Sequence, residues 1–423
     1  METNIKIEKD ERRNSIEKIL MPSTFVCWLL GVGVPRPLKY SKMSTIILRF
    51  VHFAMCSVIV AYGAIDFFTF GAVFKSDTFK IMYYSNKVAC YISSYYYVFH
   101  GLHHYEKWPE LMEKLSIIDK KLKRFFPANF NRNIKLFQLF SLFATIMIGP
   151  VSMISHGVYY YFIRPEDIFA SDLLLYYTMA QSLIVNFSFD LTVIAIYDRF
   201  RAINQAIGKI DETYTAALIV HELRRARELY HDCQIFVFSG VCQIVRFLNG
   251  IYGIHLLLSS VNSFTMVVAT LFRIYMGVVE KKYSFMLINN VIWITHAAQF
   301  AITCGVCSRA GKESSKTIVC VHEIVLSRVP KARSPCDLYA VDVARISLDS
   351  EISLRHEIND FSSQLQSRDV FFTASDFFDM DNALLRSFIG VITTYLIILV
   401  QFYQPETDQE ETFTTLGPEA IEI

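Results

Sequence analysis

A hydrophobic segment near the C-terminus, residues 380–404, carries polar side chains along one face. On a helix, spacings of four, three, four and three residues place the following side chains on one stripe: Ser387, Val391, Thr394, Ile398 and Gln401. A stripe facing lipid would be uniformly bulky and apolar, whereas polar groups inside a membrane face a bundle interior or a cavity. The stripe therefore either borders something wet or polar, or it contacts a neighbouring helix to which Thr394 and Gln401 hydrogen-bond.

Aromatic side chains with polar tips, together with a few amides, form a second group of candidates for chemistry. They lie in the expected outer halves of the other long apolar segments: Tyr83, Tyr84, His156, Tyr160, Tyr177, Asn289 and Trp293. Aromatic walls with a few polar groups suit small polar or alkaloid-like ligands. Tyrosine and tryptophan also form belts at membrane interfaces, and this alternative remains open for each tyrosine. His156, Asn289 and Trp293 lie deeper and are the stronger candidates.

The elements that must position these residues are membrane-spanning helices. The chain has 423 residues, of which 53% are hydrophobic and 19% are charged, below the roughly 25% of charged residues in soluble domains. Seven apolar segments reach the ~20 residues that a spanning helix needs: 44–70, 79–102, 136–163, 172–198, 250–272, 283–307 and 380–404. The apolar stretch 20–34 is too short to span, and we expect it to be interfacial or re-entrant. A formal net charge of +1 gives no global field for nucleic acid.

The loops between the seven segments differ strongly in their positive charge. Of the 41 Lys and Arg residues, 32 lie before segment 1 or in the loops that share its side, and five lie in the opposite loops. Positive residues concentrate on the cytosolic side of membrane proteins. This predicts a cytosolic N-terminus and, with seven spans, an extracellular C-terminus on an all-α, multi-pass membrane protein.

The last segment contains a specific sequence signature. Thr394-Tyr395, five hydrophobic residues and Gln401-Phe402 match the Thr-Tyr…Gln-Phe signature of the insect gustatory receptor family. The upstream stretch "FFTASDFF" resembles the Phe-Thr-Ala-x-x-Phe-Phe stretch of this family, and "GKESSKTIVCVHEIV" resembles its Glu-x-x-x-Thr cytosolic helix. The resemblance covers about the last quarter of the chain. Asp376 stands where the family commonly has glycine, which places the turn before the last helix in question.

The resemblance implies a ligand-gated cation channel in which the last helix of each of four subunits lines a central pore. Carried over to this chain, the hydrophobic constriction lies at or near Ile398, with Gln401 and Phe402 beside it and with Val391, Thr394 and Tyr395 on the same helix. Hydrophobic constrictions gate by dewetting, and the Gln401 carbonyl could bind partly dehydrated cations. The implied ligand is a small-molecule tastant, a sugar or a bitter compound, held in an outer pocket within each subunit. In the sixth segment, Trp293 matches a tryptophan of sugar-sensing members of the family.

The resemblance also implies a domain plan. Residues 1–43 form a cytosolic segment, 44–307 a ligand-binding bundle of six spans, 308–379 a cytosolic anchor region, 380–404 the pore helix and 405–423 an extracellular acidic tail. The packed anchor draws on about 213–250, 308–328 and 352–368. The expected partners are Na⁺, K⁺ and Ca²⁺ as permeant cations, the lipid of the plasma membrane, and further subunits in a homotetramer or a heteromer. No cofactor and no nucleic acid is expected.

Several acidic residues lie at positions for which a specific role is predicted. Asp376, Asp379 and Asp381 precede the last helix; four copies would form acidic rings that concentrate cations, and helix N-capping by Asp379 or Asp381 is an equal alternative. Asp66 and Asp190 lie in or near apolar segments, and each needs a partner.

Other classes of protein fit less well. Asp198-Arg199-Phe200 resembles the acidic-Arg-aromatic lock of G-protein-coupled receptors, but it follows the fourth segment rather than the third, and a solvated interfacial ion pair is the simpler interpretation. A secondary transporter is a further alternative, although the paired halves that transporters often show are not evident. The common motifs of hydrolases and phosphate-binding enzymes are absent from the sequence, so an enzyme is not expected.

Overall fold

The structure is a computed structural model that describes residues 16–37, 40–70, 77–123, 131–163, 170–208, 240–279, 286–328 and 370–402, with His356, Asn359 and Ser363. Within these residues the chain is helical, and its β-type pairing is one isolated bridge between Thr373 and Asp379. The predicted all-helical fold is therefore confirmed.

Helices cover all seven predicted spans. In chain order the described helices are α2 (Ile16–Leu29), α3 (Lys42–Phe70), α4 (Asp77–His103), α5 (Lys107–Lys123), α6 (Asn131–Ile146), the π-helical turn η1 (Met147–Val151), α7 (Ser152–Ile163), α8 (Ala170–Ile207), α10 (Val241–Val279), α11 (Met286–Arg328) and α13 (Asn382–Phe402). Five stretches are long and apolar enough to cross a membrane: Lys42–Ile65, Ile134–Ser155, Leu175–Gln205, Val241–Val279 and Asn382–Gln401. Helices α4 and α11 do not meet this criterion in their described residues, so the count of seven spans and the orientation of the termini remain predictions.

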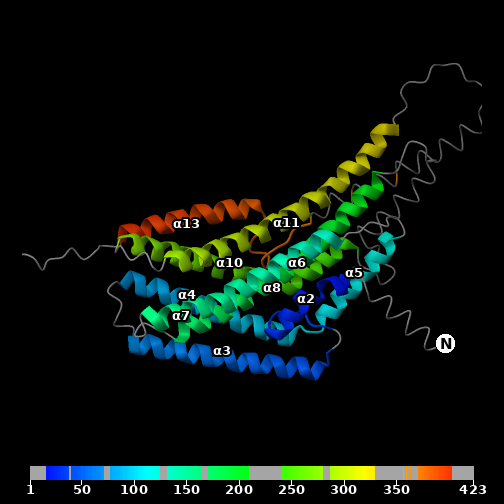
Figure 1. Cartoon of the computed structure of the whole chain (residues 1–423). Coiled ribbons are helices and arrows are strands. Elements are labelled where there is room, and N and C mark those ends of the chain that lie inside the picture. The colour runs from blue at the N-terminus through cyan, green and yellow to red at the C-terminus, as the bar shows by residue number, and fades with distance from the viewer. Residues whose placement is uncertain are drawn as a thin grey trace, which may run out of the picture.

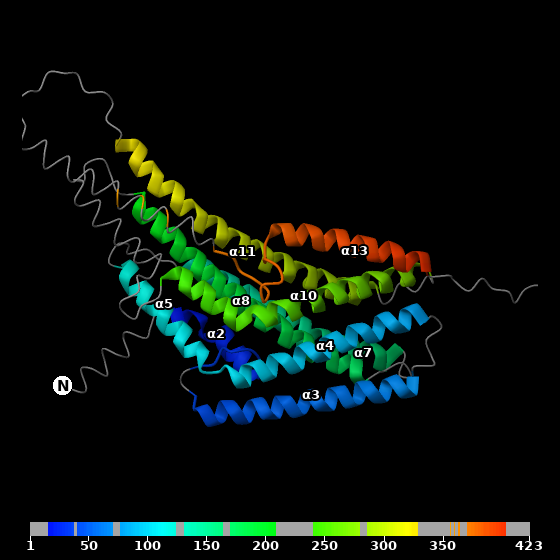
Figure 2. The ribbon, with the colours of Figure 1, turned by 180° about the vertical axis from the view of Figure 1, so that it is seen from behind.

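Helix α8 runs through the middle of the bundle, and α13 lies on its outside. Figure 1 shows α3 and α13 on opposite sides of the molecule, and Figure 2 shows the same arrangement from behind. Helix α8 packs against α2, α3, α4, α6, α10 and α11, so that 94% of its apolar stretch is buried in this chain. The corresponding share for α13 is 6%. One spanning helix is thus almost wholly enclosed, and the last one is almost wholly exposed.

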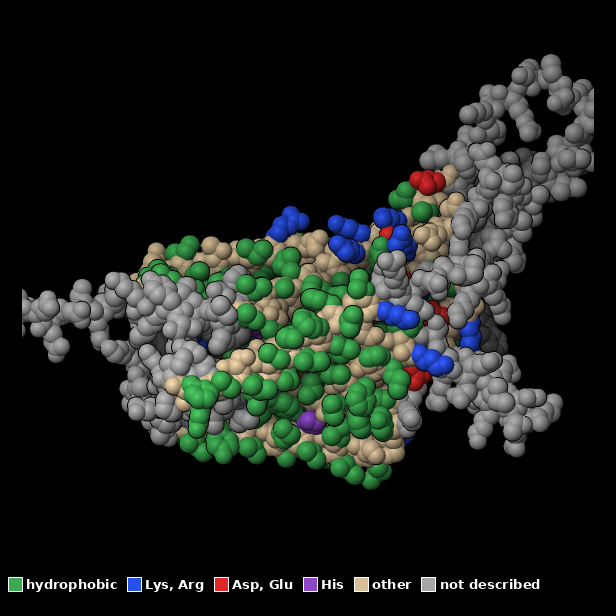
Figure 3. All heavy atoms as spheres, in the orientation of Figure 1, with side chains coloured by type: hydrophobic (Ala, Val, Ile, Leu, Met, Phe, Trp, Pro, Cys, Tyr) green, Lys and Arg blue, Asp and Glu red, His purple; other side chains and the backbone are tan. Residues whose placement is uncertain are grey.

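Three helices are longer than the predicted spans at one end of the bundle. Helix α8 continues to Ile207, α11 continues to Arg328, and α10 begins at Val241. In Figure 3 hydrophobic side chains cover most of the visible face, while Lys and Arg side chains gather toward the end from which α11 extends. This distribution agrees with the charge asymmetry of the loops.

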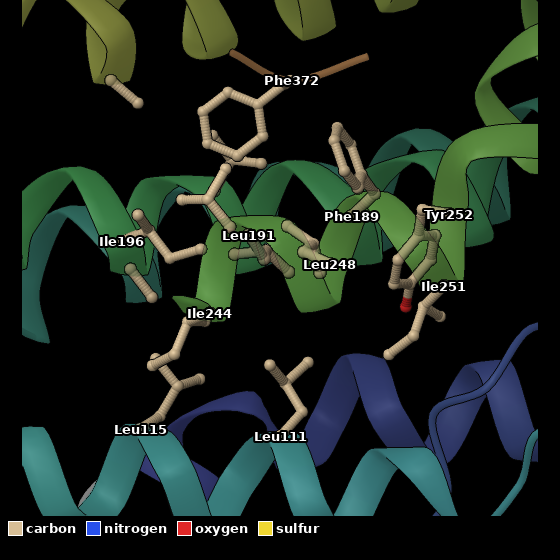
Figure 4. Close-up of a cluster of buried hydrophobic side chains, with 14 of the residues drawn as sticks. Leu111, Leu115, Phe189, Leu191, Ile196, Ile244, Leu248, Ile251, Tyr252 and Phe372 are labelled. Carbon is tan, nitrogen blue, oxygen red and sulfur yellow. The ribbon is translucent and has the colours of Figure 1, made fainter. Parts of the chain in front are cut away.

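Helix α5, which was not predicted, closes the same end of the bundle. Its buried residues recur at helical spacing, and they are Trp108, Leu111, Met112, Leu115, Ile118 and Leu122. In Figure 4 Leu111 and Leu115 point toward Ile244, Leu248 and Ile251 of α10. Burial of this apolar face explains why a short charged loop segment folds as a helix.

The stretch 20–34 forms most of α2 and the turn after it. Gly31 and Gly33 have φ angles of +66° and +67°, a conformation that glycine adopts without steric cost. The turn is fixed by Arg49 of α3, whose Nη1 donates a 2.7 Å hydrogen bond to the Gly33 carbonyl. Because α2 packs against α6 and α8, this stretch is part of the bundle, and its position at the membrane interface remains a prediction.

Candidate functional site

Helix α13 begins with a capped N-terminus. The Leu384 amide donates a 2.8 Å hydrogen bond to Oδ1 of Asp381, three residues earlier. An aspartate in this position satisfies an amide that has no partner within the helix and stabilises the positive end of the helix dipole. The capping interpretation is therefore confirmed for Asp381. Asp379 lies beside it with an exposed side chain, and rings of acids from four copies remain a prediction.

One face of α13 packs against α10 and α11 of the same chain. Ile392 is 8% exposed and lies in a cluster with Val267 and Val268 of α10. Phe388 stacks on Phe300 of α11 with ring centroids 4.2 Å apart. This face consists of bulky apolar side chains and fixes how α13 is rotated about its axis.

The predicted polar stripe lies away from that packed face. All five side chains of the stripe are exposed in this chain: Ser387, Val391, Thr394, Ile398 and Gln401. The helix therefore turns its small and polar side chains away from its own bundle, and the alternative of a contact with a neighbouring helix of this chain is not found among the described residues. Nothing in this chain covers them within the described residues.

The hydroxyls of this surface are satisfied locally. Thr394 Oγ1 donates a 3.0 Å hydrogen bond to the Gly390 carbonyl, and Thr393 Oγ1 donates a 2.9 Å bond to the Ile389 carbonyl. Such bonds to the preceding turn make a hydroxyl tolerable in an apolar setting. Gln401 is thus the residue of the stripe whose amide offers both donor and acceptor groups to a space outside the chain.

Two other candidate pore residues differ in their surroundings. The Tyr395 ring lies edge-on to Phe264 of α10, with centroids 5.5 Å apart, and the side chain is 51% exposed. Tyr395 therefore lies at the border between the packed face and the exposed one. Phe402 ends α13, and its side chain is outside the described part of the structure.

The candidate ligand-binding residues are described only in part. The backbones of Tyr83, His156, Tyr160, Asn289 and Trp293 lie in α4, α7 and α11, but their side chains are outside the described part of the structure. Tyr84 is half-buried and packs edge-on against Phe67 of α3, with centroids 4.7 Å apart. Tyr177 contacts different residues, so the two described side chains do not form one group.

Tyr177 belongs to a hydrogen-bonded cluster of α3, α4 and α8. Its hydroxyl lies in hydrogen-bonding contact with Nδ1 of His52 and accepts a 2.7 Å bond from Nε2 of Gln181. The Gln181 amide also donates to the Leu30 carbonyl at 3.0 Å and accepts a 2.6 Å bond from Ser94 Oγ. These bonds hold Tyr177 in a fixed position.

A line of buried polar side chains lies in the centre of the bundle and was not predicted from the sequence. His255 Nε2 and Ser259 Oγ of α10 each lie 2.9 Å from Oδ1 of Asn186 on α8. One turn further along α10, Asn262 Oδ1 accepts a 3.2 Å hydrogen bond from the Cys90 thiol of α4. Each residue is a polar position within a largely apolar stretch, which is the signal that could have identified it.

The buried acid Asp190 has a partner. Its Oδ2 accepts a 2.8 Å hydrogen bond from Nε2 of Gln299, and both side chains are buried between α8 and α11. The partner that the sequence required is thus an amide rather than a cation. The side chain of Asp66 is outside the described part of the structure.

The interpretation of Asp198-Arg199 as a solvated ion pair is wrong. Both residues are 5% exposed, and Arg199 pairs with Asp119 of α5 at 2.7 Å instead of with Asp198. The physical reason is α5, which covers this end of α8 and brings a carboxylate to the guanidinium. The motif is therefore a buried link between two helices.

A polar cluster joins α8 to the part of α11 that extends beyond the predicted span. Nδ2 of Asn204 donates to the carbonyl and to Oε1 of Glu313, at 2.8 and 3.1 Å, and Oδ1 of Asn204 accepts a 2.6 Å bond from Thr317. Glu313 and Thr317 are the two fixed residues of the Glu-x-x-x-Thr stretch. The described part of the predicted anchor, 240–250 and 308–328, thus packs on α8, whereas 213–239 and nearly all of 352–368 lie outside the described residues.

Comparison with known proteins places the chain in a family. The sequence model of the family described as "7tm Chemosensory receptor" matches residues 21–333 and 344–405. "Putative gustatory receptor 2a" of Drosophila melanogaster is 25% identical over 176 residues, which are 40% of this chain and 40% of that protein. "Gustatory receptor for sugar taste 43a" of the same organism is 28% identical over 164 residues, 38% of this chain and 33% of that protein. The matched stretches therefore span less than half the length of these relatives.

The fold is similar to that of a solved structure. The insect olfactory receptor OR5 from Machilis hrabei, in complex with eugenol, superposes with a TM-score of 0.56 over 91% of this chain and 98% of that chain. The sequences are 14% identical, so the likeness is one of fold.

Proposed function

The chain belongs to the seven-transmembrane chemosensory receptor family, and on that basis we propose that it is a gustatory receptor that works as a tastant-gated, non-selective cation channel. The observation that carries the proposal is the rotation of α13. Its packed face is apolar and contacts α10 and α11, while Ser387, Thr394 and Gln401 face away from the chain. Four copies arranged with these faces inward would enclose a path that is partly polar and narrowed by hydrophobic side chains.

Helix α3 of the same chain serves as a comparison, because its exposed surface has the composition expected of a lipid-facing helix. Between Ile47 and Ile65 its exposed side chains are apolar except for the hydroxyls of Ser57 and Tyr62: Ile47, Phe50, Val51, Phe53, Ala54, Met55, Val58, Ala61, Ala64 and Ile65. The exposed surface of α13 mixes Ile389, Ile397 and Ile398 with Ser387, Gly390, Thr394 and Gln401. Polar groups within a membrane are placed toward protein or water rather than lipid, and this contrast supports a pore-lining role for α13.

The gate is assigned to the ring of Ile398 side chains. A narrow apolar ring excludes water and ions until it widens, and the Gln401 amides one turn further outward would then contact the permeating cations. Phe402, Thr394, Tyr395 and Val391 complete the proposed pore surface. Ligand binding shifts this equilibrium only by its different affinity for the open and the closed state.

The ligand is a small polar molecule, with sugars as the first class to test and bitter compounds as the second. One relative carries sugar taste in its name. The pocket would lie among the outer halves of α4, α7, α8 and α11, where Tyr83, Tyr84, His156, Tyr160, Tyr177, Asn289 and Trp293 are located along the chain. Asn262 and Cys90 lie deeper in the bundle and would form its polar floor.

The subunits would assemble as a homotetramer or with other receptors of the family in the plasma membrane. The N-terminus would be cytosolic, and Na⁺, K⁺ and Ca²⁺ would permeate. No cofactor enters this mechanism.

The test is expression in a cell without native taste receptors, followed by recording of membrane current during application of a sugar panel and a panel of bitter alkaloids. The expected result is a ligand-evoked cation current with single-channel steps. A carrier-sized flux without such steps would favour a transporter. An epitope at each terminus, labelled in intact cells, is expected to show the C-terminus outside; the reverse topology would favour a G-protein-coupled receptor.

A further inference from the structure

The segment that leads into α13 is a hairpin built into the core. Residues 370–381 contain the bridge between Thr373 and Asp379, and the Met380 amide donates a 2.7 Å hydrogen bond to the Phe372 carbonyl. Phe372 and Ala374 are buried, as is Met380. Figure 4 shows the Phe372 ring directed toward the helices beneath it, on the same side as Phe189 of α8. The hairpin ends at Asp381, which caps α13, so its position sets the position of the helix.

A single side chain of α10 binds the hairpin backbone on both sides of Phe372. Asn249 Nδ2 donates a 2.8 Å hydrogen bond to the Phe371 carbonyl, and its Oδ1 accepts a 3.4 Å bond from the Thr373 amide. The side-chain amide thereby forms hydrogen bonds with the hairpin backbone of the kind that a neighbouring β-strand would form in a sheet. Asparagine and glutamine are the residues whose side chains carry a neutral donor and a neutral acceptor on one planar amide, and glutamine is longer by one methylene group.

The next turn of α10 approaches the hairpin tip closely. A methyl group at Gly253 would lie 2.9 Å from Ser375 Oγ and 3.0 Å from the Ser375 backbone nitrogen. On the other side, a methyl group at Gly311 of α11 would lie 3.3 Å from the Val370 carbonyl. The hairpin is thus wedged between two helices at positions where neither has a side chain.

The hairpin tip itself has a strained backbone. Ser375 and Asp376 have φ angles of +52° and +61°, in the left-handed region that costs a non-glycine residue free energy. Aspartate tolerates this region better than most residues, and the Asp376 carboxylate also accepts a 3.1 Å bond from Thr373 Oγ1. The surrounding contacts, including those to Asn249 and Gly253, must maintain this shape.

We propose that Asn249 and Gly253 couple α10 to α13: a movement of α10 displaces the hairpin 370–381, and the hairpin displaces the first turn of α13. This coupling rests on the proposed channel function for its physiological meaning, since it is the route by which a ligand bound in the helical bundle would reach the pore helix. Asn249 is a positioning residue here and touches neither ligand nor ions.

The mechanical part of the proposal is testable without a ligand or a current. Hydrogen exchange of the full chain in lipid nanodiscs is followed by mass spectrometry for the wild type, Asn249→Ala and Gly253→Ala. Loss of the Asn249 bonds is expected to increase exchange about ten-fold at Met380, Leu384 and Leu385, the amides at the junction with α13. Gly253→Ala is expected to increase exchange at the same amides. The matched control is Arg246→Ala, an exposed residue one turn earlier on α10, with less than about two-fold change.

The contrary result is an increase confined to Thr373, with Leu384 and Leu385 exchanging as in the wild type. Asn249 would then stabilise the hairpin locally, and the coupling would be wrong. Asn249→Gln keeps both hydrogen-bonding groups, and partial recovery of protection in that variant is expected if the amide is the cause.

A reversible cross-link tests the coupling in function. In Gly253→Cys/Ser375→Cys, oxidation would join the hairpin to α10. If the hairpin moves together with α10, the current evoked by a sugar panel is expected to differ by less than about two-fold between the oxidised double variant and the same variant in dithiothreitol. A fall of about ten-fold or more on complete cross-linking, reversed by dithiothreitol, would show that the hairpin has to move relative to α10 during gating, and this would overturn the proposal. Absence of current in the wild type would instead count against the channel function, and the exchange data would still decide whether α10 and α13 are coupled.

Discussion

Thr317 donates a 2.6 Å hydrogen bond to the side-chain oxygen of Asn204, and both residues are buried where α8 and α11 extend beyond the predicted spans. With the two bonds from Asn204 Nδ2 to Glu313, both the nitrogen and the oxygen of the Asn204 side chain have partners on α11. The Glu-x-x-x-Thr spacing follows directly from this geometry, because residues four apart lie on one face of a helix and can bind a single amide.

This cluster predicts the effect of removing one hydroxyl. Thr317→Val preserves the shape of the side chain and leaves the buried oxygen of Asn204 without its donor. We expect the free energy of unfolding to fall by about 1–3 kcal/mol. Thermal unfolding of the purified protein in detergent measures this loss. Ser315→Ala, an exposed position on the same helix, is the control and is expected to change stability by less than about 0.5 kcal/mol. Equal melting temperatures for Thr317→Val and the control would contradict the prediction.

A second prediction concerns the buried pair of Asp190 and Gln299. Gln299→Leu leaves the Asp190 carboxyl between α8 and α11 without the 2.8 Å bond, and a loss of about 1–3 kcal/mol is expected. The double variant Asp190→Leu/Gln299→Leu removes both polar groups and is expected to recover part of that loss, because two apolar side chains need no hydrogen bond. The melting temperatures of the wild type, of the single variants Asp190→Leu and Gln299→Leu, and of the double variant form a double-mutant cycle. Strict additivity of the two changes would show that the pair does not interact.

The sequence predicted the parts of this molecule that depend on long, repeated patterns. Each of the seven predicted apolar stretches is helical in its described part, apart from the start of the last one. The spacing of Ser387, Thr394 and Gln401 correctly placed these residues on one side of α13. These predictions succeeded because hydrophobic periodicity is a property of one segment and does not depend on which segment lies beside it.

Pairings between segments could not be predicted in this way. The partner of Asp190 is 109 residues away, and the partner of Arg199 lies on α5, a helix that was not anticipated. The departure from glycine at Asp376 is explained by the structure: the position has a φ of +61°, which glycine adopts freely and aspartate accepts. Most side chains of the predicted ligand pocket lie outside the described residues, so this pocket stays a prediction.

The third prediction is a pH dependence at the hairpin. Partial desolvation of its otherwise exposed carboxyl, together with the charges of Asp381 and Asp376, raises the pKa of Asp379 above its ordinary value of 3.8. The folded protein therefore binds this proton more tightly than the unfolded chain, and the contribution of Asp379 to stability falls as the pH rises through the interval above 3.8. Asp379→Asn is expected to melt at a higher temperature than the wild type at pH 7, and the difference should vanish as the pH approaches 4.

Glu106 provides a control of opposite sign. The ion pair with Lys42, 2.6 Å long, lowers the pKa of Glu106, so this carboxylate favours the folded state above its ordinary pKa and loses that effect as the pH falls. Glu106→Gln should therefore melt slightly below the wild type at pH 7 and approach it in acid. The pair is exposed, so the effect should be small and should weaken with salt. Parallel shifts in both variants would contradict the assignment to Asp379.

The fourth prediction concerns Gln401. If its amide contacts permeating cations, Gln401→Ala should shift the reversal potential under bi-ionic conditions while leaving the ligand concentration for half-maximal current nearly unchanged. The reason is that the Gln401 side chain is exposed on the outside of the bundle, whereas ligand would bind in its interior, so selectivity and affinity should separate. Ser387→Ala, near the start of α13 on the same stripe, serves as the comparison for position along the proposed pore. An unchanged reversal potential with a large change in ligand potency would place Gln401 in the ligand site instead.

The last prediction assigns the gate. Ile398→Ala shortens the side chain that would close an apolar ring, so water and ions should enter without ligand, and the basal current per receptor at the cell surface should rise. Ile397 is the matched control, because it is equally apolar, 53% exposed against 39% for Ile398, and rotated about 100° around the same helix. A rise in Ile398→Ala alone identifies the side of α13 that faces the pore. A rise in Ile397→Ala alone would require the helix to be turned about its axis in the assembled channel, and unchanged currents in both well-expressed variants would move the gate elsewhere on α13.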